Sequence, residues 1–255
     1  GVRGPVEVVA GAEASGMVAV ASAARLVASG EADVVIAGAA QALQPALLAH
    51  LVDQGWTSSA PAMPFDNRHA GFVPAEGAAY VVVEAEDHAR ERGAEVHALI
   101  AGTGTIFDPR AEPLALSDAT EAGRAQQAAL GNAGYLQNQV DFFVSCANGL
   151  PAADFAEGFG LQRTFGRHTY YASVAAPAGA LGFALAASGP LSLVMAIEAL
   201  RHQEVFPTAG FEQVAEGLDL SFARERRAER LDCILVSSLG VGGTLSALVM
   251  DRPPA

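Results

Sequence analysis

Residues 4–17 of the chain read Gly-Pro-Val-Glu-Val-Val-Ala-Gly-Ala-Glu-Ala-Ser-Gly-Met. The apolar run at residues 6–10 predicts a buried strand, the small residues after it predict a tight turn, and a helix is expected to begin near Ala14. Such a turn presents one side chain at a helix N-terminus, where the helix dipole and free N–H groups lower a thiol pKa or receive an oxyanion. That side chain is Glu13. Because a carboxylate is a poor acyl nucleophile, the stretch predicts a nucleophile turn without its nucleophile.

The net charge of the chain limits the kinds of molecule that it is expected to bind. Its 255 residues carry a formal net charge of −13, and all 15 basic residues are arginines. Nucleic-acid binding calls for a basic face, so we expect no nucleic-acid partner. Four arginines at positions 224, 226, 227 and 230 form a local cluster that could bind an anion. A solvated helix face is the favoured interpretation of this cluster.

The sequence contains no apolar run of the about 20 residues that a membrane span requires, and it has no pattern of a signal peptide. Its two cysteines, Cys146 and Cys233, do not make a disulfide framework. A reducing compartment is therefore expected, and we predict a cytoplasmic location. We expect no metal site and no membrane partner.

Strand and helix patterns alternate along the chain, which predicts an α/β fold with layered helices and sheets. Short apolar runs predict the strands, and longer stretches of small and aliphatic residues predict the helices. The predicted strands are at residues 33–38, 79–84, 96–105, 141–146, 168–173, 231–237 and 245–251. The predicted helices are at residues 15–29, 43–52, 84–93, 118–133, 152–165 and 181–200.

One block carries the strongest family signal. Residues 63–78 read Met-Pro-Phe-Asp-Asn-Arg-His-Ala-Gly-Phe-Val-Pro-Ala-Glu-Gly-Ala. This block resembles the Pro-Phe-Asp, Gly-Phe-Val and Glu-Gly-Ala pieces of the β-ketoacyl synthases, in the thiolase-like superfamily. The resemblance implies a layered α-β-α-β-α fold, and it makes the block a scaffold loop beside the active site and the acyl tunnel. The scaffold residues are then Phe65, Asp66, His69, Phe72 and Glu76.

His69 departs from the family pattern, which usually has arginine at this position. With Asp66 and Arg68 beside it, a structural polar cluster is favoured over a catalytic base. Residues 238–245, Ser-Leu-Gly-Val-Gly-Gly-Thr-Leu, resemble the family's glycine-rich loop. That loop supplies backbone donors, which implies a scaffold role for Gly240, Gly242 and Gly243.

The resemblance also implies where catalytic groups should lie. The family has a cysteine at the elbow, two histidines and a lysine. Counting from the Gly-Pro start puts Glu13 at the cysteine position, and Cys146 follows the strand at the first histidine position. The lysine and second histidine fall on Ala175 and Ala180, with a register that is uncertain by one residue. Residues 169–201 contain no histidine or lysine, so the conclusion does not depend on the register.

Cys146 admits two interpretations, a replacement nucleophile and a buried structural thiol, and the second is favoured. The Gly149-Leu150-Pro151 run and the following Asp154 are closer to chain-length factors, the catalytically degenerate partners of ketosynthases. The resemblance therefore implies a pseudo-enzyme that is not an enzyme on its own. It would pair with a catalytic ketosynthase as a heterodimer and shape the tunnel for the growing acyl chain of a polyketide or fatty-acid-like product.

Two alternatives stay open. Glu13 could serve a malonyl-carrier-protein decarboxylase, or the chain could be an inert ketosynthase fragment. On the favoured interpretation, the chain alone neither condenses nor decarboxylates malonyl carrier protein. No cofactor is expected on the chain itself, since the acyl groups travel on the phosphopantetheine of an acyl carrier protein. That acidic carrier is expected to dock mainly on the partner, because this chain is acidic too.

The resemblance divides the chain into two halves, residues 1–93 and residues 94–255. The family's first strands and helices would lie before Gly1, so the chain looks like the C-terminal part of such a protein. We therefore expect open sheet edges and exposed apolar surface in the first half. The product, its length and the organism do not follow from the sequence.

Overall fold

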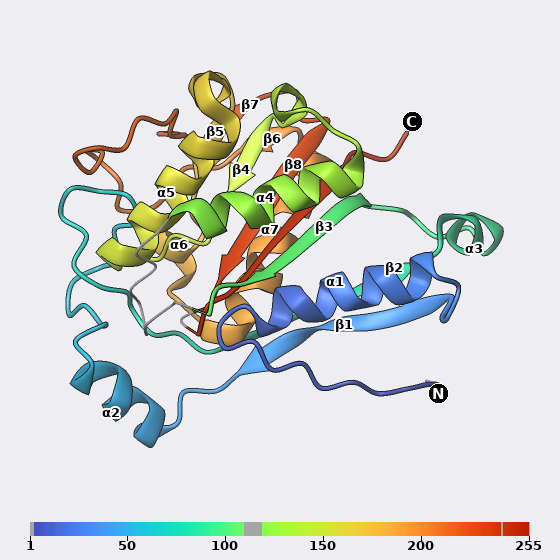
Figure 1. The fold of residues 1–255 in the computed structure, drawn as a ribbon, viewed down its shortest axis with the longest axis horizontal. Coiled ribbons are helices and arrows are strands. Elements are labelled where there is room, and N and C mark those ends of the chain that lie inside the picture. The colour runs from blue at the N-terminus through green and yellow to red at the C-terminus, as the bar shows by residue number, and fades with distance from the viewer. Residues whose placement is uncertain (1–2, 110–118, 241, 255) are drawn as a thin grey trace.

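Two β-sheets and the helices between and beside them organise the chain (Figure 1). The structure, a computed structural model, describes residues 3–109, 119–240 and 242–254. The helices are α1 (Ser15–Ala28), α2 (Pro45–Asp53), α3 (Glu86–Glu91), α4 (Ala119–Ala133), α5 (Pro151–Phe165), α6 (Ala178–Leu181) and α7 (Ser188–His202). Short 3₁₀ helices are η1 (Gln137–Gln139), η2 (Gly166–Tyr170) and η3 (Leu185–Ala187). The predicted α/β fold is confirmed.

The strands separate into the two halves of the chain. They are β1 (Val34–Gln41), β2 (Gly77–Glu84), β3 (Leu99–Phe107), β4 (Phe142–Val144), β5 (Ser173–Ala175), β6 (Glu204–Val205), β7 (Arg227–Ala228), β8 (Cys233–Leu239) and β9 (Thr244–Asp251). β1 and β2 form an antiparallel pair, while five later strands form a sheet in the order β3-β9-β8-β4-β5. Strand β4 is parallel to β5 and β8, and β9 is antiparallel to β8 and β3. The boundary between residues 93 and 94 stays a prediction.

Helices α1 and α7 lie between the two sheets and supply the central apolar layer. Met17 and Val20 of α1, Leu193 and Ala196 of α7, and Ile234 of β8 belong to one buried cluster. The layer forms because apolar residues on both helices recur at the helical period, whereas alternate residues of β8 and β9 face it. Small residues let the two helices approach at their N-terminal ends.

Helices α4 and α5 cover the opposite face of the five-stranded sheet (Figure 1). Ala125 and Ala129 of α4 pack on this face together with Leu235 and Val249 of the sheet. A Cβ atom at Gly104 of β3 would lie 2.3 Å from the Ala125 backbone oxygen. Small residues on both sides therefore permit helix and strand to come this close.

The outer face of the β1–β2 pair is apolar and exposed. Ile36 lies opposite Val82 in the register, and both side chains are exposed, as are Val34 and Tyr80. The other face of the same pair packs on α1 through buried Ala37 and other residues of the central apolar cluster. The expected exposed apolar surface of the first half is therefore present, and apolar patches of this kind mark interaction surfaces.

The predicted buried strand at residues 6–10 is wrong. This segment belongs to no strand, and the side chains of Val6 and Val8 are 90% and 94% exposed. A strand needs a neighbour for its backbone hydrogen bonds, and no described residue pairs with this segment. Apolar composition alone does not supply that neighbour.

Two further boundaries differ from the prediction. Residues 166–170 form the 3₁₀ helix η2 in place of the predicted strand at 168–173, since Gly166 adopts a φ of +52° that turns the chain. The predicted helix at 181–200 begins only at Ser188. Gly182 and Leu185 have φ values of +72° and +46°, and left-handed residues interrupt a right-handed helix.

The contact between α1 and α7 yields a stability prediction. A Cβ atom at Gly16 would lie 2.4 Å from the Ala186 backbone oxygen and 2.6 Å from the Pro190 ring. We expect Gly16→Ala to destabilise the chain by about 2–3 kcal/mol, because overpacking displaces backbone. Urea denaturation measures this difference.

The matched control is Gly131→Ala on the exposed side of α4, where an added Cβ meets nothing within 4 Å. Because alanine favours helices over glycine, this variant should gain about 0.5–1 kcal/mol. Equal stability of the two variants would contradict a close contact at Gly16.

Candidate functional site

The chain turns sharply into α1 at residues 11–14. The Ala14 N–H donates to the Gly11 oxygen over 3.0 Å, and Ser15 Oγ accepts from the Gly11 N–H over 2.8 Å. Ala12 adopts a φ of +49°, a left-handed conformation that costs an alanine about 1–2 kcal/mol. The turn places half-buried Glu13 directly before the first turn of α1. The expected turn geometry is present although its incoming strand is not.

The glycine-rich loop lies against this turn. A Cβ atom at Gly240 would stand 2.8 Å from the Gly11 backbone oxygen, so only glycine fits there without displacing the turn. Gly243 has a φ of +88° and donates its N–H to the Gly240 oxygen over 2.9 Å. Gly242 is exposed. Two of the three predicted loop glycines, Gly240 and Gly242, therefore lie against the turn that carries Glu13, since a Cβ atom at Gly242 would stand 3.9 Å from Ala12 Cβ.

Cys146 lies at the end of β4 and lines a cavity of about 20 Å³. This volume has room for about one water molecule. Other lining residues come from the segment after β4, the end of β8, α6 with the turn after it, and the start of α7. They include Ser145, Phe183, Ser188 and Ser238. The cavity is therefore bounded by hydroxyl groups, a thiol and apolar side chains.

Ala175 and Ala180 do not line this cavity, and neither does Glu13. Ala175 is buried at the end of β5, where its oxygen accepts from the Ser145 N–H over 2.8 Å. Ala180 is exposed on α6. Phe183 lines the cavity instead, and Phe72 packs on it with ring centroids 5.0 Å apart. Neither of these two predicted positions therefore lines the cavity, although Ala175 is hydrogen-bonded to Ser145, the residue before Cys146.

Asp154 of α5 connects two loops at the site. Its side chain is fully buried, and its Oδ2 accepts from the Phe65 N–H over 2.8 Å and lies 2.9 Å from His69 Nδ1. Its Oδ1 accepts from the N–H groups of Asn148 and Gly149 over 2.9 and 3.0 Å. The His69 side chain contacts Asp154, while its backbone N–H donates to the Asp66 oxygen over 3.0 Å; a structural role for His69 stays a prediction. Phe65, with a φ of +63°, is held in a left-handed conformation by its hydrogen bond to Asp154.

Glu157 lies one turn after Asp154 on α5, and its side chain is also fully buried. Burial raises the pKa of Glu157 to about 7, even though the hydrogen bond from Ser237 and the neighbouring Ser145 and Cys146 side chains favour its charged form. Ser237 donates to Oε1, while Oε2 accepts no hydrogen bond from the described residues. Burial likewise raises the pKa of the Cys146 thiol well above its ordinary value. The sequence prediction missed Glu157, although its spacing of three from Asp154 puts both acids on one helix face.

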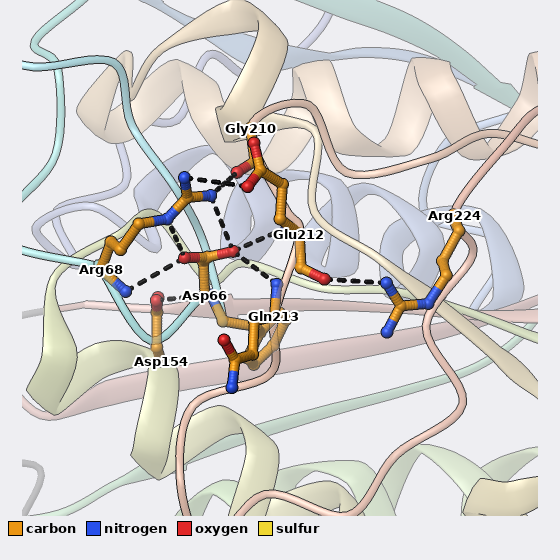
Figure 2. A network of polar contacts seen from close by, with 8 residues as sticks. Asp66, Arg68, Asp154, Gly210, Glu212, Gln213 and Arg224 are labelled. Atoms are coloured by element: carbon orange, nitrogen blue, oxygen red, sulfur yellow. Dashed lines mark hydrogen bonds and ion pairs between the residues drawn. The ribbon is translucent and has the colours of Figure 1, made fainter.

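Asp66 holds the loop at residues 210–213 against the scaffold block (Figure 2). Its buried carboxylate accepts from the N–H groups of Glu212 and Gln213 over 2.6 and 2.9 Å, and from Arg68 Nε over 2.6 Å. Burial opposes ionisation, but these donors outweigh it and hold the pKa of Asp66 well below its usual range. Arg68 also donates to the Gly210 oxygen over 3.1 Å. Asp66 therefore ties the scaffold block to the loop at residues 212–213, and its scaffold role in the family sense stays a prediction.

Glu76 lies apart from the cavity. It is exposed, and its carboxylate accepts from the Leu43 N–H over 3.3 Å, just before α2. The arginine cluster is not a helix face, because these residues lie in β7 and in the irregular segments beside it. Each of the four binds a neighbouring group: Arg224 the Glu212 oxygen, Arg226 Glu204, Arg227 Glu229, and Arg230 Asp232. These contacts favour no anion site.

The models of two protein-family domains match the sequence of this chain. "Beta-ketoacyl synthase, N-terminal domain" matches residues 1–89, and "Beta-ketoacyl synthase, C-terminal domain" matches residues 66–212. The chain belongs to the β-ketoacyl synthase family. The resemblance seen in residues 63–78 is thereby confirmed at the family level.

Several relatives match almost the whole chain. It is 38% identical to "Putative polyketide beta-ketoacyl synthase 2" of Streptomyces halstedii over 100% of this chain and 62% of that protein. It is 36% identical to "Tetracenomycin polyketide synthase ketoacyl synthase beta subunit" of Streptomyces glaucescens over 99% of this chain and 62% of that protein. It is 32% identical to "3-oxoacyl-[acyl-carrier-protein] synthase 2" of Coxiella burnetii over 98% and 62%. The chain thus spans about three-fifths of the length of these relatives.

Solved structures share the fold. A β-ketoacyl synthase from Burkholderia phymatum superposes with a TM-score of 0.90 at 28% identity, over 95% of this chain and 60% of that one. The ishigamide ketosynthase/chain length factor superposes with a TM-score of 0.87 at 24% identity, over 95% and 60%. The second likeness shows the fold alone. The thiolase-like layered fold expected from the resemblance is confirmed.

The expectation that the chain is not an enzyme is wrong. Relatives that match nearly all of it are named as synthases, among them the 3-oxoacyl-[acyl-carrier-protein] synthase 2 of Coxiella burnetii and that of Vibrio cholerae. The presence of Glu13 and Cys146 where the family pattern has a cysteine and a histidine therefore does not establish a pseudo-enzyme. The error came from treating the loss of expected residue types as a loss of activity.

Within the described ranges, no helix is long and apolar enough to cross a membrane. Histidine, cysteine and carboxylate side chains in the same ranges form no group suited to hold a metal ion. Both cysteines are free.

The burial of Glu157 predicts a pH-dependent stability. Its pKa of about 7 in the folded chain exceeds the ordinary 4.5, so the folded state binds the proton more tightly than the unfolded state. The stabilisation is fully present below pH 4.5 and is lost as the pH rises through about 7. We expect a loss of about 3 kcal/mol between these limits, which urea denaturation at pH 5 and pH 8 measures.

Glu157→Gln should remove most of this loss, because the amide does not ionise. Glu216→Gln is the matched control, since it makes the same substitution at a carboxylate that is exposed to solvent. If Glu157→Gln and the unaltered chain lose the same stability between pH 5 and pH 8, Glu157 is not the buried acid that titrates.

Proposed function

We propose that the chain is the β-subunit, or chain-length-factor, component of a polyketide β-ketoacyl synthase. In this proposal it pairs with a ketosynthase chain and helps to form the space that holds the growing acyl chain. The observation that carries it is a higher identity to polyketide synthases numbered 2, and to one relative named as a beta subunit, than to those numbered 1. Identity is 38% and 37% to polyketide synthases numbered 2 and 36% to a named beta subunit, against 33% to polyketide synthases numbered 1.

The site supports the same proposal. Glu13 occupies the turn at which the resemblance expects a cysteine, and Cys146 stands where it expects a histidine. These residue types distinguish the chain from the ketosynthases that it resembles. The aromatic pair Phe72 and Phe183 forms an apolar wall beside the cavity, which suits contact with an acyl chain.

The exposed segment at residues 6–10 supports the pairing. Val6 and Val8 expose their side chains, and the extended backbone between them leads directly into the Glu13 turn. An extended apolar segment can add to the edge of a partner's sheet through main-chain hydrogen bonds. We therefore place the ketosynthase partner at this segment, with Glu13 at the rim of the contact.

The substrates in this proposal are acyl groups on the phosphopantetheine of an acyl carrier protein. One structural neighbour is titled as a type II polyketide synthase acyl-carrier protein in complex with its ketosynthase, at 24% identity. The charge of −13 on this chain disfavours an acidic carrier at long range, so the carrier docks mainly on the partner. A cytoplasmic location and the division at residues 93 and 94 belong to the same proposal.

The test of pairing is the affinity of the chain for a catalytic polyketide ketosynthase. Glu13→Ala should weaken the complex by about 1–3 kcal/mol, the usual scale for truncating a buried polar contact, whereas Glu13→Gln should stay near the unaltered affinity. Surface-immobilised ketosynthase provides the measurement. A chain that does not bind any such ketosynthase, at concentrations where the β-type relatives do, contradicts the proposal.

The test of the acyl space is the product length of the reconstituted synthase. Phe183→Leu puts a smaller side chain in the wall and thereby enlarges the cavity, so products should shift towards longer chains. Phe206→Leu is the matched control, because Phe206 packs on Phe142 and does not line the cavity. An identical product distribution for both variants would count against an acyl-lining role of Phe183.

A further inference from the structure

The cavity beside Cys146 combines three groups that acyl transfer requires: a nucleophile, a base and a donor for the developing oxyanion. Cys146 supplies a thiol that lines the cavity. Glu157 supplies a fully buried carboxyl group, which the Ser237 hydroxyl connects to the backbone of Cys146. Ser188 supplies a hydroxyl that lines the cavity from the start of α7. The elbow residue Glu13 does not line this cavity.

Two atoms in this constellation have unused hydrogen-bonding capacity. Glu157 Oε2 and Ser188 Oγ are both buried, and neither has a hydrogen-bond partner among the described residues. A buried polar atom without a partner costs about 1–3 kcal/mol, and such atoms concentrate at functional sites. Formation of a thioester at Cys146 would use both atoms. The Ser188 hydroxyl would donate to the thioester carbonyl oxygen, and Glu157 Oε2 would accept the proton that the attacking thiol loses.

The local structure holds the thiol in place. The Cys146 N–H donates to Ser237 Oγ over 3.3 Å, and the same hydroxyl donates to Glu157 Oε1. The ends of β4 and β8 and the buried face of α5 are thus connected around one thiol. Leu181 of α6, which also lines the cavity, is 43% exposed, so α6 separates the cavity from solvent by a partly exposed side chain. The other thiol, Cys233, is buried within β8 and lines no part of the cavity.

We propose that Cys146 accepts an acyl group from an acyl thioester, with Glu157 as its general base and Ser188 as a donor to the carbonyl oxygen. The Cys146 sulfur forms a bond to the thioester carbonyl carbon, and the bond from that carbon to the departing sulfur breaks. The proton of Cys146 passes to Glu157 and then to the departing thiolate, so no oxidant or reductant is required. The substrate class rests on the proposed function, whereas the site rests on the geometry alone.

The resting thiol is protonated, because burial raises its pKa, and attack therefore depends on the base. Asp154 lies one turn earlier on α5, and its negative charge further opposes ionisation of Glu157. A base with a pKa of about 7 is half ionised near neutral pH. The acylation rate should accordingly rise as the pH increases through about 7.

The test incubates the unaltered 255-residue chain with S-acetyl-N-acetylcysteamine, a small thioester that resembles the end of phosphopantetheine. Intact mass and peptide mapping should find one acetyl group, on Cys146, with Cys233 unmodified as the internal control. Cys146→Ala should abolish the adduct. Glu157→Gln should slow acetylation by about 100-fold and remove the rise near pH 7, as expected for a lost general base.

Ser188→Ala provides a second variant that does not alter the buried acid, and it should slow acetylation by about tenfold or more. Absence of acetyl on Cys146 in the folded chain overturns the inference, and so does a Glu157→Gln variant with unchanged rate and pH profile. The assay needs no partner chain. A chain that pairs with a ketosynthase but is not acetylated therefore overturns this inference alone, and one that is acetylated but does not pair overturns the proposed pairing alone.

Discussion

The site depends on one buried carboxylate, that of Asp154. It accepts hydrogen bonds from the backbone of Phe65 in the scaffold block and of Asn148 and Gly149 after β4, and it contacts His69. A buried carboxylate without donors would cost several kcal/mol, so these loops and the acid are stable only together. Segments that are about 85 residues apart in sequence are thereby held in contact.

The same acid sets the geometry of the chemistry next to it. Asp154 fixes the rotation of α5, and Glu157 one turn later then points into the sheet beside Cys146. Among the residues that the structure describes, no arginine forms an ion pair with Glu157, and burial therefore decides its protonation. In contrast, Asp66 has Arg68 as a partner and stays ionised. Two buried acids of the same chain thus have opposite pKa shifts for identifiable reasons.

Much of the fold follows from the sequence, because helix α1 and strands β1, β8 and β9 have the expected apolar patterns. The segment at residues 6–10 has such a pattern too, but a strand also needs a neighbour, which local sequence does not describe. The position of Phe183 at the cavity was not predictable, since residues 169–201 contain no histidine or lysine to set the register. Glu157 was overlooked because an acid on a helix ordinarily faces solvent. Its burial depends on the packing of the whole helix.

The most direct measurement is amide hydrogen exchange in the unaltered chain and in Asp154→Asn. If Asp154 holds the site together, the amides of Phe65, Asn148 and Gly149 exchange slowly in the unaltered chain. They lose protection together in the variant, while the amides of Gly240 and Thr244 keep theirs. Loss of protection in only one of the two loops, or in neither, would contradict the account.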